Sequence, residues 1–204
     1  MRFIIIFLFF LDSSCAQPVD KLVHTVDPAA KKLNDSAVSI AMHSYDYTKA
    51  VELLDKATQI DSNYFGAYRN KMSFQGLVKP FDADKILVIQ KSLNRLRPLD
   101  PEYYMNIGML YFKKGDSLTS STYFSNALLH FDNILDTMHS TSPGYDVLMM
   151  QKAYTLIFQG NDQKAHDLLQ KLYDTTKDSV AKEMILPALQ KTRKDFISEL
   201  MSSY

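Results

Sequence analysis

The chain has no tryptophan and one cysteine, Cys15, among its 204 residues, and its formal net charge is zero. A single cysteine cannot form a disulfide within the chain, so packing alone must hold the fold together. The balance of 23 basic and 23 acidic residues argues against nucleic acid as the main partner, because binding to phosphates requires a concentrated positive field. The nearest approach to a basic patch, Lys191, Arg193 and Lys194, is better explained as a solvated helix face.

Motifs of catalysis and metal binding are also missing from the sequence. It contains no G-x-G-x-x-G, no P-loop, no H-E-x-x-H and no G-x-S-x-G. His130, Asp132 and His139 could be drawn together around a metal, but their spacing fits no familiar site and thiolate ligands are absent from the mature body of the chain. We therefore predict a protein that is not an enzyme and has no cofactor and no metal site.

Only one long apolar run is present, Phe3 to Leu11, and it follows the basic residue Arg2. Nine helical residues at about 1.5 Å each reach only about half of a bilayer's hydrocarbon core, so the run does not predict a spanning helix. Small residues follow it, ending in Ala16. This order is typical of an export signal, so we predict a signal peptide at 1–16 and a protein of the bacterial cell envelope, in the periplasm or anchored to the outer membrane.

Two ways of processing this signal are open. Ser13-Ser14-Cys15 resembles the lipobox of bacterial lipoproteins, in which the cysteine becomes the lipidated first residue, although Asp12 stands where an aliphatic residue is usual. The alternative is cleavage after Ala16, which makes Gln17 the new N-terminus. Lipidation of Cys15 would provide the only contact with a membrane. In both cases residues 17–26 form a short tether.

Helix start and stop signals divide the rest of the chain. Asp-Pro at 27–28 and 100–101 and Ser-Pro at 142–143 are typical of helix starts, because Asp and Ser accept hydrogen bonds from free amides and Pro is tolerated in the first turn. Gly115 and Gly160 favour helix ends. We predict helices at 28–43, 46–60, 62–77, 82–97, 101–114, 117–135, 143–159, 162–174 and 179–202, and no strand. Pro187 should kink or split the last helix.

Small and apolar residues recur at helical spacing along these segments. The trio Ala50, Leu54 and Ala57 and the trio Ser120, Phe124 and Ala127 lie 70 residues apart, which is two units of 35. Each trio falls on one helix face. We expect Gly108 against Ser120, and Ala153 against Ala165, to let the two helices of a pair approach closely.

With this pattern the chain resembles the tetratricopeptide repeat family. The best match is residues 101–128, and the residues that carry it are Pro101, Tyr104, Ile107, Gly108, Tyr111, Gly115, Phe124 and Ala127. The second-best match comprises Ala153, Leu156, Gly160, Ala165 and Leu169. The resemblance implies an all-α, right-handed solenoid of about four helix pairs at 27–176, closed by a capping helix at 177–204.

The resemblance also implies a binding groove lined by the first helix of each pair. The positions carried over to this sequence are Asp35, Ser39, His43, Arg69, Ser73, Met105, Met109, Phe112, Lys113, Met150, Tyr154, Ile157 and Phe158. Flexible, polarisable methionines suit a surface that accepts helices or extended peptides. The alternative is that this methionine and aromatic stripe is core, or that the C-terminal helix covers it.

A groove without catalytic groups predicts a scaffold or adaptor that binds a protein or peptide segment. Two other functions stay open. One is a lipoprotein subunit of an outer-membrane assembly or secretion machine. The other is a glycan-binding accessory protein, for which tyrosines could stack on sugars, although the absence of tryptophan weakens that interpretation.

Overall fold

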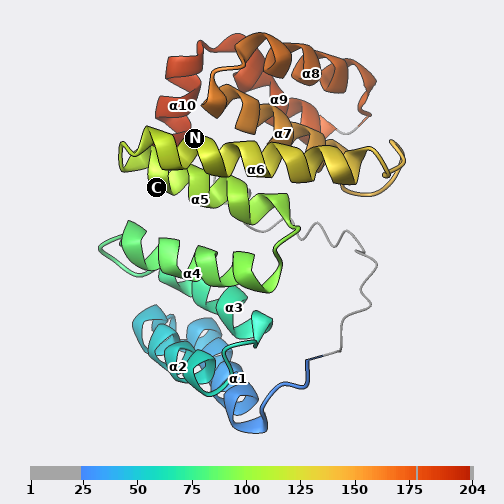
Figure 1. The fold of residues 1–204 in the computed structure, drawn as a ribbon. Helices are drawn as coiled ribbons and strands as arrows, with labels where there is room; N and C mark the ends of the chain where they lie inside the picture. Colours follow the sequence, from blue (N-terminus) through green and yellow to red (C-terminus); the bar gives the residue numbers. More distant parts are fainter. Residues whose placement is uncertain (1–23, 178, 203–204) are drawn as a thin grey trace. The chain divides into compact units, whose positions relative to one another are not determined.

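The computed structural model describes residues 24–177 and 179–202. These residues form ten helices and no strand, which confirms the all-α class. The helices belong to two compact units that divide between Leu99 and Asp100, one with α1 to α4 and the other with α5 to α10 (Figure 1). The predicted signal peptide, Cys15 and tether residues 17–23 lie outside the described residues.

The first unit is built from two helix hairpins. It comprises α1 (Pro28–Ser44), α2 (Tyr47–Ile60), α3 (Phe65–Gln75) and α4 (Ala83–Leu96). Asp27 begins α1 as predicted, since its carboxylate accepts hydrogen bonds from the amides of Ala29 and Ala30 at 2.7 and 3.2 Å. Asp46 and Asp82 cap α2 and α4 in the same way. The core contains Ala37, Ala50 and Ala57 among other alanines, so the helix backbones can approach closely.

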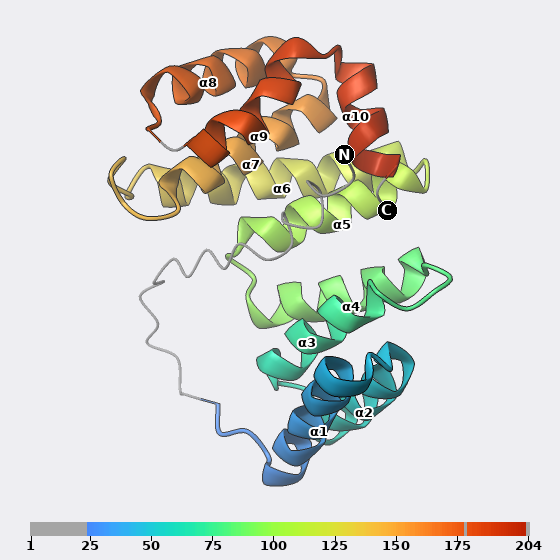
Figure 2. The same cartoon turned by 180° about the vertical axis from the view of Figure 1, so that it is seen from behind.

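The second unit contains two further hairpins and a C-terminal helix pair. It comprises α5 (Pro101–Lys113), α6 (Ser117–Leu135), α7 (Tyr145–Gln159), α8 (Asp162–Thr175), α9 (Ser179–Gln190) and α10 (Arg193–Ser202). In both units each helix packs mainly against its neighbours in sequence, and the first helices of successive hairpins, α1 with α3 and α5 with α7, also touch. Seen from behind, α9 lies over α7 and α8, and α10 turns away from it toward the α5–α6 hairpin (Figure 2).

The close approach inside the α5–α6 hairpin occurs at Gly108, as predicted, but against a different residue. The atoms nearest to a Cβ built on Gly108 belong to the ring of Phe124, not to Ser120. Phe124 is 1% exposed and stacks on Phe158 of α7, with ring centroids 5.3 Å apart. Gly108 therefore provides the space for an aromatic contact that joins three helices.

The helix bounds of α1 to α8 agree with the prediction to within three residues at each end. The single C-terminal helix predicted at 179–202 is wrong, because the chain forms α9 and α10 there, and the split is not at Pro187. Pro187 lies inside α9, and the break comes at Lys191 and Thr192. Thr192 starts the new helix, since its Oγ1 accepts from the amide of Asp195 at 3.2 Å. Among the described residues, no helix has the length and apolar character needed to cross a membrane.

Candidate functional site

Most of the groove positions predicted in α5 and α7 are buried. Six of the nine residues favoured for partner binding are at most 7% exposed: Met105, Met109, Met150, Tyr154, Ile157 and Phe158. They belong to one hydrophobic cluster that also contains Phe196, Ile197 and Leu200 of α10. In this structure these six side chains are core, and they share that core with residues of the chain's own C-terminal helices.

Tyr154 of α7 contacts both C-terminal helices. Its hydroxyl donates a hydrogen bond of 2.7 Å to the carbonyl oxygen of Met184 in α9, and its ring lies 5.1 Å from the ring of Phe196 in α10. Burial raises the pKa of the Tyr154 hydroxyl far above its usual range. The hydroxyl therefore stays neutral and serves as a donor that joins α7 to α9.

Arg193 of α10 covers the end of α7. Its Nε donates to the carbonyl of Ile157 at 2.7 Å and its Nη2 donates to the carbonyl of Phe158 at 3.0 Å. The last carbonyls of a helix have no partner within the helix and carry a partial negative charge, so a guanidinium is well suited to them. Asp162, at the start of α8, lies 3.6 Å from the same Nε. Arg193 is exposed, as the predicted solvated face requires, and its guanidinium also caps α7.

The remaining three favoured residues are less buried. Lys113 is exposed at the end of α5, and Phe112 is half-buried with its ring edge-on to Phe158 at 5.4 Å. In the first unit, Arg69 is exposed on α3. These positions keep a surface that a partner can reach without rearrangement.

The polar groove positions of the first hairpin lie on one exposed face of α1. Asp35 accepts from Lys31 Nζ at 2.7 Å, and the ring of His43 contacts the carbonyl oxygen of Ser39 at 2.8 Å. Both contacts are between residues four apart in an exposed helix, so they contribute little to stability. A recess lined by α1 side chains, among them Lys31, Asp35 and Ser39, follows the same face. This part of the predicted surface is accessible.

The three residues considered for a metal each contact a different residue. His130 lies with its ring 5.0 Å from that of Tyr104, Asp132 pairs with Lys152 Nζ at 2.5 Å, and His139 contacts the Thr141 hydroxyl at 3.2 Å. Within residues 24–177 and 179–202 no group of three or more His, Cys, Asp or Glu side chains could hold a metal ion. Burial lowers the pKa of His130, although the negative charge of Asp100 opposes this effect.

A series of regularly spaced amide side chains was not recognised in the sequence. Asn34, Asn70 and Asn106 lie 36 residues apart in the first helices of three successive hairpins. Within the first unit, Asn70 Nδ2 donates to Asn34 Oδ1 at 2.8 Å and so joins α3 to α1. In the second unit, Asn106 is buried in α5, and Gln151 is buried in α7 with no hydrogen-bond partner for its amide. The regular spacing is the signal that could have found them.

An ion pair accompanies two of these amides. Lys71, which follows Asn70, pairs with Asp55 of α2 at 2.5 Å. Lys152, which follows Gln151, pairs with Asp132 of α6 at the same distance. Each lysine thus joins the first helix of one hairpin to the second helix of the preceding hairpin, once in each unit.

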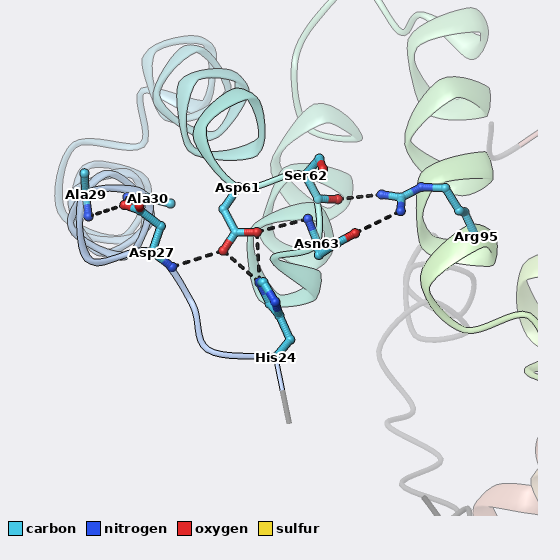
Figure 3. A network of polar contacts seen from close by, with 8 residues as sticks. All are labelled: His24, Asp27, Ala29, Ala30, Asp61, Ser62, Asn63 and Arg95. Atoms are coloured by element: carbon cyan, nitrogen blue, oxygen red, sulfur yellow. Dashed lines mark hydrogen bonds and ion pairs between the residues drawn. The ribbon is translucent and has the colours of Figure 1, made fainter. Parts of the chain in front are cut away.

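A polar network surrounds Asp61 in the turn between α2 and α3 (Figure 3). Its carboxylate accepts from the amides of Asp27 and Asn63 at 3.1 and 3.0 Å and contacts His24 Nε2 at 2.9 Å. Burial raises the pKa of Asp61, but these hydrogen bonds outweigh that effect and hold it below its usual range. Arg95 of α4 donates to the neighbouring Asn63 Oδ1 at 3.0 Å. The network fixes the turn and the chain before α1.

A scan of the sequence against protein-family models finds no match, and a search of curated proteins finds no relative.

Proposed function

We propose that this chain is a non-catalytic scaffold or adaptor of the tetratricopeptide type, which binds a protein or peptide segment through the first helices of its hairpins. The observation that carries the proposal is the recurrence of one inter-hairpin contact, Lys71 with Asp55 and Lys152 with Asp132, next to the amides of the two first helices. The same contact between neighbouring hairpins, made once in each unit, is what a repeat protein would show. Repeat proteins use the surface of the repeated element for recognition. The proposal includes a right-handed solenoid as the arrangement of the hairpins.

The proposed setting is the cell envelope of a bacterium. The basic residue, apolar run and small residues at 1–16 support export, and Cys15 is the proposed site of a lipid anchor. The proposed partner class is protein, because the exposed positions Ser39, Arg69 and Lys113 are polar or charged and the chain has no concentrated positive field for nucleic acid.

Site-specific photocrosslinking of the full chain in its native cells tests the proposal. A photoreactive residue is placed at Ser39, Arg69 or Lys113, all exposed on first helices, and the matched control is Thr122, exposed on the second helix α6. We expect the first three positions to capture the same partner class and Thr122 to capture none. Equal capture from all four positions, or none from any, would contradict a binding role for the first helices.

The identity of what is captured separates the competing functions. One envelope protein captured in stoichiometric amount favours the subunit of an assembly or secretion machine. A changing set of proteins favours the adaptor. Glycan bound to the purified chain, with no protein captured, favours the accessory role.

A further inference from the structure

Helix α10 has the character of a docked ligand. Its residues Phe196, Ile197 and Leu200 are at most 9% exposed, whereas Lys194 and Ser198 on the opposite side are exposed. Three buried apolar residues on one face and polar residues on the other make a short amphipathic helix. Isolated helices of ten residues are marginal in water, so the surface beneath α10 supplies most of its order.

The surface beneath α10 is the one that the sequence predicted as a partner-binding groove. Phe196 lies against the ring of Tyr154, and Ile197 and Leu200 belong to the same hydrophobic cluster as Met109 and Phe158. Figure 2 shows α10 descending from the end of α9 toward the α5–α6 hairpin, and Figure 1 shows the same course from the other side. The chain's own helix therefore shares its hydrophobic cluster with these groove positions and directly contacts Tyr154.

Helix α10 is joined to the rest of the unit by a short linker and a few polar contacts. Only Lys191 and Thr192 separate it from α9, and Thr192 gives it a start of its own. One polar anchor is Arg193, whose guanidinium bonds the carbonyls of Ile157 and Phe158 and lies 3.6 Å from Asp162 of α8. An ion pair between Lys191 and Glu199 joins the linker to α10. A helix held in this way can leave as one piece by rotation at residues 191–192.

We propose that α10 occupies in cis a docking site for an amphipathic helix, and that a partner helix of the same chemistry displaces it. The partner helix carries a basic residue followed by apolar residues three, four and seven positions later, the pattern of Arg193, Phe196, Ile197 and Leu200. The basic residue bonds the carbonyls of Ile157 and Phe158 at the end of α7, an aromatic residue lies on Tyr154, and the aliphatic residues enter the cluster. This proposal rests on the proposed binding function and names its partner class.

Tethering determines how the two helices compete. A segment joined by a short linker acts at an effective concentration in the millimolar range, so α10 fills the site in the unliganded chain. The apparent affinity for a partner helix equals the intrinsic affinity multiplied by the fraction of molecules in which α10 has left the site. Weakening α10 without removing it therefore strengthens binding in trans, an effect opposite to that expected when a binding residue is lost.

The test uses a fluorescent peptide of residues 191–202 and the full chain. In the variant Phe196→Ser/Leu200→Ser the docked face of α10 is weakened, and in the matched control Lys194→Ser the exposed face is changed. We expect fluorescence anisotropy to show peptide binding to the double variant at least about tenfold tighter than to the unchanged chain or the control. A peptide with serine at both apolar positions should not bind to any of them. Failure of the native peptide to bind a folded double variant overturns the proposal.

Hydrogen exchange on the unchanged chain decides the matter if the double variant does not fold. An exchangeable α10 opens locally, so its amides should exchange well before those of α7. Protection of α10 equal to that of α7 shows that it is a permanent part of the core, and this overturns the proposal. The proposed function fails separately, when no exposed first-helix position captures a partner in cells.

Discussion

The ring of Phe124 lies so close to the backbone of Gly108 that a Cβ built there would come within 2.6 Å of Cε1. The ring cannot move aside easily, because it is 1% exposed and stacked on Phe158. We expect Gly108→Ala to lower the free energy of unfolding by about 1–3 kcal/mol through overpacking, with Gly108→Leu at least as costly. Urea denaturation followed by circular dichroism measures the loss.

Gly76→Ala is the matched control for this substitution. Gly76 follows the last residue of α3 and has an ordinary φ of −63°. A Cβ built there meets nothing closer than 3.6 Å. Alanine at Gly76 should change stability by no more than about 1 kcal/mol, in the stabilising direction, because it restricts the unfolded chain. Equal losses at both glycines would mean that the contact with Phe124 does not matter.

Asp61 should make the first unit sensitive to acid. Its folded pKa is lowered, so the carboxylate contributes stability above its ordinary pKa of about 4, and this contribution is lost as pH falls through the folded value. Asp61→Asn removes the charge that His24 and the amides of Asp27 and Asn63 contact. We expect the unchanged chain to be more stable than the variant at pH 6 and the difference to shrink steadily below about pH 4.

Urea titrations at several pH values measure this difference. The control is Glu52→Gln, which breaks an exposed pair with Lys49 on the same helix. An exposed pair of this kind contributes little, so the control should follow the unchanged chain at every pH. A stability gap for Asp61→Asn that is the same at pH 3 and pH 6 would show that the carboxylate's charge plays no part.

The helices could be predicted from the sequence because their ends are determined locally. Asp27 and Asp100 accept amide hydrogen bonds at helix starts, and Gly160 ends α7 with a φ of 83°. These signals lie within a few residues of the boundary that they set. The position of the split between α9 and α10 differs from the prediction because the cap at Thr192, a weaker sequence signal than Pro187, determines it.

The state of the groove could not be predicted in the same way. Periodicity shows that Tyr154 and Phe158 share a helix face, but not whether a later segment covers that face. The cover depends on Phe196 and Arg193, which reach α7 from more than 30 residues further along the chain. Local composition shows only that Arg193 is basic, and its carbonyl partners follow from the fold.

Cys15 gives a prediction about processing that is independent of the fold. If the lipobox-like sequence is used, the mature chain starts at Cys15 and carries lipid. Intact-mass measurement of protein extracted from membranes should then show a mass above that of residues 15–204 by the added acyl groups. Cys15→Ser should abolish the addition and release the protein from the membrane fraction. A chain that starts at Gln17 without lipid would contradict the anchor and leave the adaptor proposal intact.

The bond between Asn70 and Asn34 should set the register of the first two hairpins. Asn34 is 6% exposed, so Asn70→Ala leaves its Oδ1 without the 2.8 Å partner in a buried place. We expect a loss of about 1–3 kcal/mol in unfolding free energy, the cost of an unsatisfied buried polar group. The double variant Asn34→Ala/Asn70→Ala should lose less than the sum of the two single variants, because no amide is then left unpaired. Strictly additive losses in this cycle would show that the two amides stabilise the fold independently and that the hydrogen bond between them contributes no coupling energy.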